Sequence, residues 1–163
     1  MPSGKTARLA SGVRLRYEVT EPPEGTKRRG RVVVTPGGKQ GVDGARTMAR
    51  MMAERGFLVM THDRRGTGLS SWGIREHERR RGDDGAPLPE PITHALDTVE
   101  LVALAEGFNP DGGDAEPPHW LGESSGARMS IFAAAYAPSA VQKVSAPPPS
   151  LGNASALPTE PRA

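Results

Sequence analysis

The stretch that decides the fold is Gly122-Glu123-Ser124-Ser125-Gly126, a G-x-S-x-G sequence in a chain of 163 residues. Residues 119–121 (His-Trp-Leu) precede it and predict a very short strand. Residues 127–137 are almost all apolar or small, which predicts a helix buried nearly all round, and Pro138 ends it. The pattern therefore predicts a sharp strand-to-helix turn that exposes the Ser124 hydroxyl.

A simpler interpretation of the same residues is that Ser124 is only the N-cap of the helix, because serine is a preferred residue at that position. Both interpretations place Ser124 at a helix N-terminus, where the helix dipole favours developing negative charge. The sequence leaves the two interpretations open at this point.

Two short apolar runs upstream predict parallel strands that are covered on both faces. These runs are residues 31–35 (Arg-Val-Val-Val-Thr) and 57–61 (Phe-Leu-Val-Met-Thr). Between them, apolar residues recur at helical spacing from 45 to 52, after Asp43 as a cap and before Gly56 as a terminator. A strand, a helix and a strand in this order predict a right-handed parallel crossover.

The flanking segments predict further elements around this crossover. Residues 12–19 alternate apolar and polar side chains, which is typical of a half-buried strand, expected at an antiparallel edge. Residues 64–91 have no apolar period and predict a solvated excursion. Thr93 offers a cap for a helix that runs to about Glu106, and residues 141–144 predict the start of one more strand. Together the elements predict an α/β fold, a three-layer sandwich with a mostly parallel sheet.

The length of the chain suits one domain with a single core, expected over residues 1–145. Residues 146–163 are rich in proline, serine and alanine and lack a periodic apolar pattern, so we expect a disordered tail there.

Charge and composition exclude several classes of partner. The formal net charge is +2, from 21 basic and 19 acidic residues, which is too balanced to predict a nucleic-acid partner. No window approaches the ~18 consecutive apolar residues of a membrane span, and residues 1–14 lack the apolar core of a signal peptide, so we expect a cytoplasmic protein with no membrane partner. The absence of cysteine excludes disulfides and thiolate metal sites, and we expect no metal site.

Two glycine-containing segments directly follow the two predicted parallel strands. Thr35-Pro36-Gly37-Gly38 ends the first strand, and free backbone N–H groups in such a loop can bind an oxyanion where no Cβ prevents close approach. A plain strand-to-loop turn is the alternative. The segment 63–70, with the sequence DRRGTGLS, follows the second strand.

In this order, the glycine pair, DRRGTGLS and G-x-S-x-G resemble motifs of the α/β-hydrolase superfamily, over about residues 10–145. The resemblance implies an incomplete α/β-hydrolase fold, corresponding to roughly the first six strands of an eight-stranded sheet. It implies that Ser124 is the nucleophile and that the backbone N–H groups of Gly38 and Ser125 form the oxyanion hole. It assigns DRRGTGLS to a structural turn that braces the loops. Pro36 replaces a histidine that is frequent in the oxyanion motif, as in other P-G-G forms. No metal or organic cofactor is implied.

The acid and the histidine of a catalytic triad have no matching positions after Ser124. Hydrolases with this elbow order their triad as nucleophile, acid and histidine, but Glu160 is the only carboxylate side chain downstream. Without a general base, a serine hydroxyl stays protonated and is a poor nucleophile. An upstream histidine as a substitute base remains an alternative, with one on the strand before the elbow and the others expected in distant elements; the four are His62, His77, His94 and His119.

We therefore expect a serine-dependent hydrolase acting on an ester, an amide or a carbon–carbon bond next to a carbonyl in a small-molecule substrate. This particular chain is expected to be a truncated product, inactive alone, whose tail is foreign to the fold. The strand near Val141 is then expected to form an unprotected edge that favours self-association. The rival hypothesis is a non-catalytic binding or interaction module on the same scaffold.

Overall fold

The computed structural model describes residues 4–38, 40–71, 79–109 and 116–145. The predicted tail, 146–163, lies outside the described residues, as do parts of the predicted excursion (72–78) and of the loop before the elbow (110–115). The elements are β1 (Lys5–Arg8), β2 (Arg14–Thr20), β3 (Gly30–Thr35), α1 (Val42–Ala53), β4 (Phe57–His62), α2 (Glu90–Leu104), β5 (His119–Gly122), α3 (Ser125–Tyr136), the 3-10 helix η2 (Pro138–Ala140) and β6 (Lys143–Ser145).

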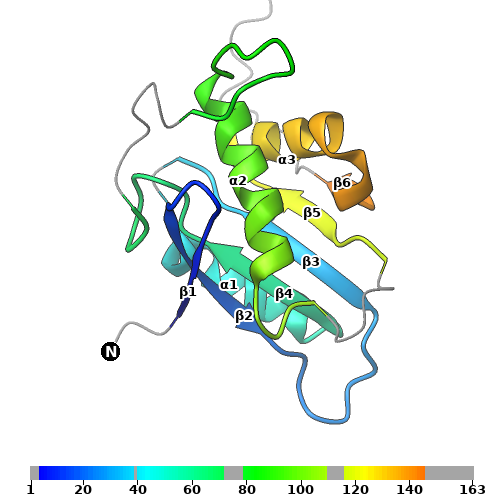
Figure 1. Ribbon diagram of the computed structural model, residues 1–163. Helices are drawn as coiled ribbons and strands as arrows, with labels where there is room; N and C mark the ends of the chain where they lie inside the picture. Colours follow the sequence, from blue (N-terminus) through cyan, green and yellow to red (C-terminus); the bar gives the residue numbers. More distant parts are fainter. Residues whose placement is uncertain (1–3, 39, 72–78, 110–115, 146–163) are drawn as a thin grey trace, which may run out of the picture.

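The strands form one six-stranded sheet in the order β1-β2-β4-β3-β5-β6 (Figure 1). β4, β3, β5 and β6 are parallel to one another, whereas β1 and β2 run antiparallel to their neighbours. The predicted crossover is confirmed, because β3 and β4 are parallel neighbours that α1 connects. The predicted α/β class with a mostly parallel sheet is also confirmed.

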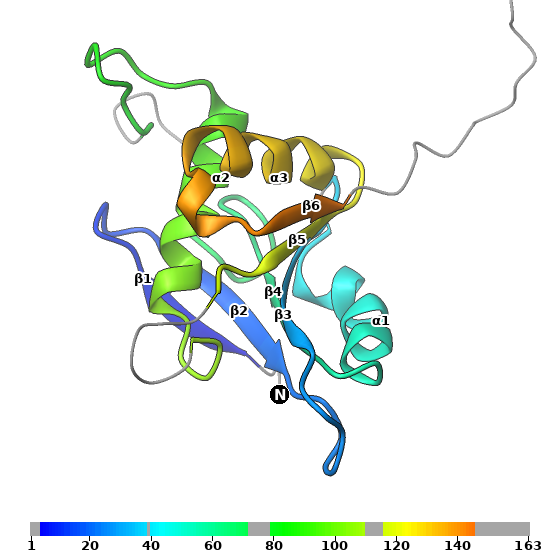
Figure 2. The same cartoon turned by 90° about the vertical axis from the view of Figure 1, so that its right-hand side faces the viewer.

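Helices cover both faces of the sheet, with α1 on one face and α2 and α3 on the other (Figure 2). The valines of β3 alternate between the two sides, as successive strand residues must. Val33 packs in the cluster that includes apolar residues of α2 and α3, whereas Val32 and Val34 pack with the alanines of α1. Burying each such side chain contributes roughly 1.5–3 kcal/mol. A continuous apolar run therefore marks a strand between two helical layers.

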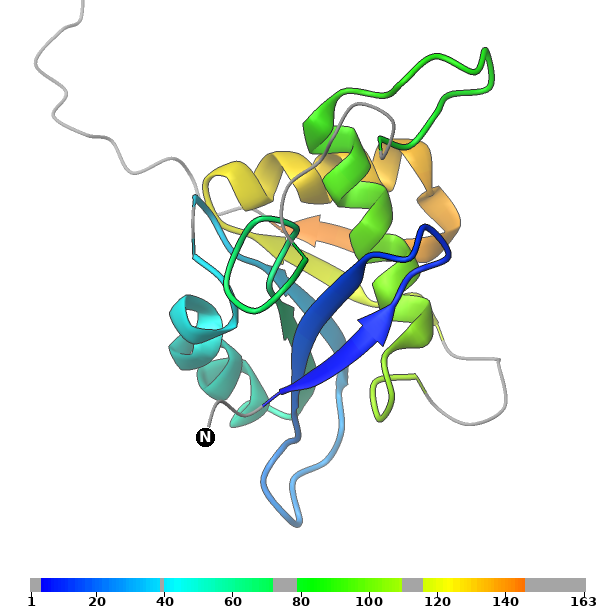
Figure 3. The same cartoon turned by 60° about the vertical axis from the view of Figure 1, so that its left-hand side comes forward.

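The N-terminal edge of the sheet differs from the prediction. β2 was expected at the edge, but β1 lies outside it and pairs with it antiparallel. Only Ala7 of β1 is partly buried, so the segment lacks the apolar alternation that predicts a strand. Figure 3 shows the β1–β2 pair beside α2, and the Glu106 N–H donates to the Tyr17 hydroxyl (3.0 Å) to join β2 to the end of that helix.

Two helices also begin before their predicted caps. α1 begins at Val42, with Asp43 in its first turn. α2 begins at Glu90, so Thr93 is a buried residue inside the helix. Proline is tolerated in a first turn because the N–H that it lacks has no intrahelical acceptor there, which explains how Pro91 fits.

The prediction that residues 127–137 are buried nearly all round is wrong. Ile131 and Tyr136 are 54% and 51% exposed. α3 buries one stripe only, at i, i+3, i+4 and i+7: Gly126, Met129, Ser130 and Ala133. The helix packs on β5 and α2 along that stripe, and nothing among the described residues covers its opposite side.

Candidate active site

The elbow between β5 and α3 is a tight β-turn with Ser124 at its second position. Ser124 has φ 52° and ψ −119°, and it is the single non-glycine residue with positive φ among the described residues. The Gly126 N–H donates to the Glu123 carbonyl oxygen (2.8 Å) and closes the turn. These angles are those of a type II′ turn, whose first central position normally takes glycine. A serine there stores about 1–3 kcal/mol of backbone strain.

Glycines flank this turn because backbone atoms leave no room for a Cβ. A Cβ on Gly126 would lie 2.0 Å from the carbonyl oxygen of Thr35, and one on Gly122 would lie 2.5 Å from the carbonyl oxygen of Gly126. A Cβ on Gly37 would lie 2.9 Å from the Cβ of Ser124. The loop after β3 is therefore in direct contact with the elbow.

The interpretation of Ser124 as a helix cap is wrong. Ser124 occupies the N-cap position of α3, but its side chain makes no capping hydrogen bond. The residue is exposed, at the carboxyl end of a strand in the middle of the parallel part of the sheet. The Ser124 side chain is thus exposed and makes no capping contact with the helix that it precedes.

The glycine loop places a backbone donor at the elbow. The Gly38 N–H donates to Ser125 Oγ over 2.8 Å, and the Glu123 N–H donates to the Thr35 carbonyl oxygen over 3.2 Å. Gly38 has φ +51°, a left-handed conformation that suits glycine. Ser125 is the first residue of α3, so its own N–H has no acceptor within the helix. The structure therefore brings the three residues Gly38, Ser124 and Ser125 together.

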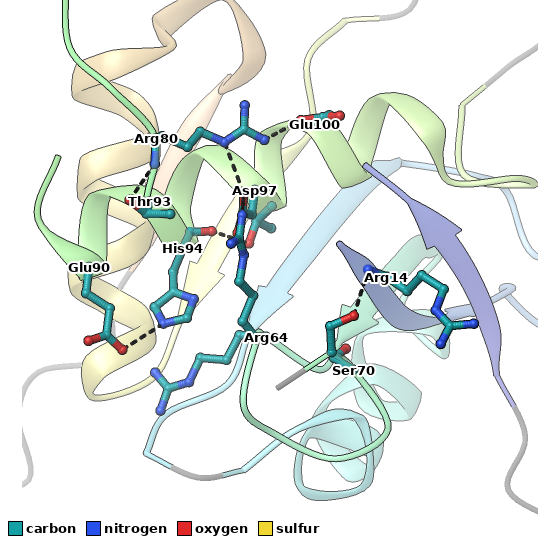
Figure 4. Close-up of polar contacts among 12 residues, drawn as sticks. Arg14, Arg64, Ser70, Arg80, Glu90, Thr93, His94, Asp97 and Glu100 are labelled. Atoms are coloured by element: carbon teal, nitrogen blue, oxygen red, sulfur yellow. Dashed lines mark hydrogen bonds and ion pairs between the residues drawn. The ribbon is translucent and has the colours of Figure 1, made fainter. Parts of the chain in front are cut away.

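A pocket of about 340 Å³ lies beside Ser125. Arg64, from the loop after β4, lines it and donates from Nη1 to Ser125 Oγ (3.4 Å). Figure 4 shows Arg64 extending towards the side of α2 that carries Glu90 and His94. His94 Nε2 lies 3.3 Å from Glu90 Oε1, and both residues line the same pocket. Burial lowers the pKa of His94, although its hydrogen bond to Glu90 opposes the shift.

Solved structures with a similar fold include several hydrolases. A hydrolase from Pseudomonas aeruginosa PA01 is 18% identical with a TM-score of 0.63, over 86% of this chain and 44% of that one. Epoxide hydrolase A from Mycobacterium thermoresistibile is 23% identical with a TM-score of 0.65, over 90% and 39%. An α/β hydrolase from Sphaerobacter thermophilus DSM 20745 is 20% identical with a TM-score of 0.61, over 87% and 44%.

The chain has the α/β-hydrolase fold. It spans less than half the length of these three structures. No protein-family model matches the chain, and no curated protein matches it either.

Within this fold, the DRRGTGLS segment forms the bracing turn that the resemblance implies. Asp63 accepts the N–H groups of Val42 (2.7 Å) and Leu69 (2.9 Å), so one carboxylate ties the start of α1 to the loop after β4. Arg16 donates to the same carboxylate (3.3 Å). A Cβ on Gly68 would lie 2.1 Å from Asp63 Oδ2, which explains why this position is glycine.

The neighbouring arginine fixes the same loop to α2. Arg65 Nη2 donates to Asp97 Oδ1 over 2.9 Å, and both side chains are almost fully buried. Arg80 Nε also donates to Asp97 (3.0 Å), and its N–H donates to Thr93 (3.3 Å), as Figure 4 shows. The segment 64–91 was predicted to be a solvated excursion, but its described part contains these buried contacts. These buried contacts were not predicted, because the sequence of a charge-rich segment does not indicate which arginine faces the carboxylates of α2.

The pocket was not predicted from the sequence. The expectation that His94 lies in an element distant from the elbow is wrong. His94 lines the pocket with Ser125, because α2 crosses the sheet next to α3. Its hydrogen-bond partner is Glu90 rather than Ser124. The spacing of Glu90 and His94, four residues apart, is a signal of a shared helix face, but α2 was predicted to begin only at Thr93.

No group of three or more histidine and carboxylate side chains in the described part of the chain could hold a metal ion. Likewise, no helix within those residues has both the length and the apolar character needed to cross a membrane.

Proposed function

We propose that this chain carries the nucleophile half of a serine hydrolase active site. Ser124 Oγ attacks the carbonyl carbon of an ester, an amide or a ketone with an activated carbon–carbon bond, and its proton passes to a general base. The carbonyl oxygen becomes an oxyanion that accepts hydrogen bonds from the Gly38 and Ser125 N–H groups. Collapse of this intermediate expels the leaving group, which takes up the proton, and water then releases the acyl group from Ser124.

The observation that carries the proposal is the strained turn at Ser124. A strain of about 1–3 kcal/mol persists only where the surrounding structure over-determines it, and such positions cluster at active sites. Three glycines leave space for the turn, and the loop that bears Gly38 lies against it. A serine that served only to start a helix would make a capping hydrogen bond, and Ser124 makes none.

The base in this proposal comes from further polypeptide rather than from the described residues. Among these, no histidine hydrogen-bonds to Ser124, and His94 is engaged by Glu90. Removing a member of a triad leaves only the oxyanion hole and binding, at a cost of several orders of magnitude in rate. We therefore propose that the chain represents part of a longer hydrolase and is nearly inactive alone.

Labelling with a fluorophosphonate probe tests the nucleophile. We expect slow labelling of the wild-type chain at Ser124, located by peptide mass spectrometry. Added imidazole supplies a base and accelerates the labelling. Ser124→Ala abolishes it, whereas the matched variant Ser125→Ala retains it, because only one of the two adjacent hydroxyls is the nucleophile. Labelling that survives in Ser124→Ala contradicts the proposal.

The second candidate function is a binding module that keeps the scaffold without the chemistry. The hydrogen bond from Gly38 to Ser125 Oγ favours it, because this donor is already engaged by the chain itself. An absence of labelling at Ser124, with and without imidazole, would favour this candidate over the hydrolase.

Self-association through the outer edge of the sheet is part of the same proposal. Among the described residues, β6 is the last strand of the sheet, and α3, which packs against β6, exposes Ile131 and Tyr136. An unpaired parallel edge with apolar neighbours favours pairing with another chain. We expect the sedimentation coefficient to rise with protein concentration and Ile131→Lys to suppress that rise. A sedimentation coefficient independent of concentration contradicts this expectation.

A further inference from the structure

The pocket beside the elbow is enclosed by three elements that meet at the carboxyl end of the sheet. The loop after β4 contributes Arg64 and Thr67, the first turns of α2 contribute Glu90 and His94, and the first turn of α3 contributes Ser125 and Arg128. Its volume of about 340 Å³ is near the lower end of the roughly 300–1,000 Å³ range of ligand pockets. The pocket therefore suits a small molecule or the end of a larger one.

Two guanidinium groups in this pocket have no carboxylate partner among the described residues. Arg64 is half-buried and makes its hydrogen bond to the neutral hydroxyl of Ser125, and Arg128 is exposed without an ion pair. Burial lowers the pKa of Arg64, with Glu90 acting in the opposite direction. An arginine nevertheless stays charged in proteins. Arg65, which also lines the pocket, is neutralised by its buried pair with Asp97.

One negative charge faces these two positive charges. Glu90 is 59% exposed on its side chain, and its carboxylate lies against His94 Nε2. The pocket thus keeps an excess of about one positive charge after Arg65 and Asp97 cancel. Both α2 and α3 also begin at this pocket, at Glu90 and Ser125, and the N-terminal end of a helix favours an anion.

We infer that the pocket binds the carboxylate group of the substrate, with Arg64 as the principal contact. This inference rests on the proposed function, because it places the anionic end of the substrate next to the nucleophile. A guanidinium matches a carboxylate through two parallel hydrogen bonds. A carboxylate carries one charge, which the excess of about one positive charge balances, whereas a phosphate carries about −1.5 to −2. The substrate class is therefore an ester, amide or ketone that bears a carboxylate.

Binding to the Ser124→Ala variant tests the pocket without chemistry. The probes are monomethyl succinate, which combines an ester with one carboxylate, and dimethyl succinate, its neutral analogue. Backbone amide shifts in NMR titrations report the dissociation constant. We expect saturable binding of monomethyl succinate, with shifts at Gly38, Thr67 and Ser125, and binding of dimethyl succinate weaker by about tenfold or more.

Arg64→Gln in the same background should weaken the binding of monomethyl succinate by about tenfold or more, which corresponds to about 1.4 kcal/mol. Arg64→Lys keeps the charge without the fork and should give an intermediate value, which preserves the test if Arg64→Gln does not fold. The matched control is Arg81→Gln, which removes an exposed arginine that does not line the pocket and should change the affinity less than about twofold.

Equal affinity for the two esters, no effect of Arg64→Gln, or tighter binding of inorganic phosphate would each overturn the inference. Failure of the proposed function has a different signature. In that case the wild-type chain does not label at Ser124, although the carboxylate still binds.

Discussion

The buried side chain of His62 should make the fold less stable as the pH falls, and its hydrogen bonds show which ring nitrogen would take up the proton. It is the last residue of β4 and is fully buried, with Nε2 lying 3.0 Å from Thr98 Oγ1. The Thr98 hydroxyl already donates its only proton to the His94 carbonyl oxygen (2.9 Å). His62 Nε2 must therefore carry a proton and donate it, so Nδ1 is the unprotonated nitrogen. Nδ1 is buried without a hydrogen-bond partner among the described residues.

Protonation of Nδ1 would create a buried cation. Burial lowers the pKa of His62 from 6.5 to about 4; the charge of Asp63 opposes the shift, and His94 and Arg64 add to it. Between these two pH values the unfolded chain binds a proton that the folded chain excludes, so stability falls as the pH falls. The gap between 6.5 and about 4 corresponds to about 3 kcal/mol, and about 2 kcal/mol is lost by about pH 5, at about 1.36 kcal/mol per pH unit.

Urea unfolding across this pH range measures the effect, with the fluorescence of buried Trp120 as a reporter of the core. The comparison variant is His62→Gln, whose side-chain amide can still donate to Thr98 but does not titrate. We expect His62→Gln to be less stable at neutral pH and to lose about 3 kcal/mol of the pH dependence between about pH 4 and 6.5. The dependence that remains comes partly from His94, whose pKa is also lowered by burial. Parallel pH profiles for the two proteins would refute this reasoning.

Three further predictions concern the elbow and its braces, and urea unfolding measures each of them. Ser124→Gly should be more stable than Ser124→Ala by about 1 kcal/mol, because only glycine relaxes at φ 52°; equal stabilities would argue against strain at the elbow. Gly126→Ala should cost about 3 kcal/mol, because its Cβ meets the Thr35 carbonyl oxygen. The matched control Gly82→Ala, whose Cβ has only the ends of the Asp84 and Leu88 side chains as nearest neighbours, should change stability by less than about 1 kcal/mol. Asp97→Asn should cost about 3–5 kcal/mol by leaving buried Arg65 without its anion, and a loss below about 1 kcal/mol would show that water compensates.

The parts of the fold that could be predicted from the sequence are those whose residue pattern is compatible with only one structural environment. The valine run of β3 is apolar on both of its faces, so it belongs between two helical layers, and the glycines of the elbow mark backbone contacts that no other residue allows. β1 escaped prediction because one partly buried alanine in four residues gives no period. The exposed side of α3 escaped prediction because Ile131 and Tyr136 are apolar but exposed, and an apolar residue type does not by itself establish burial.

The pocket escaped prediction for a different reason. Arg64, His94 and Arg128 come from three different segments of the chain, and the packing of α2 next to α3 brings them together. Their spacing in the sequence does not indicate a shared pocket, since the sequence does not distinguish an arginine in a solvated charge run from an arginine that lines a pocket. Side-chain clusters built from distant elements thus require the topology before they can be recognised.

The hydrogen bond between Gly38 and Ser125 engages the N–H group that we propose as an oxyanion donor. A ligand oxygen that approaches Gly38 must first displace Ser125 Oγ, a bond of 2.8 Å. A typical bond of this kind contributes about 1 kcal/mol, so Ser125→Ala should tighten the binding of an oxyanion analogue about fivefold. If Ser124 is the nucleophile that we propose, the side chain next to it discriminates against weakly polarised carbonyl oxygens, which compete poorly for the Gly38 N–H, before any covalent bond forms.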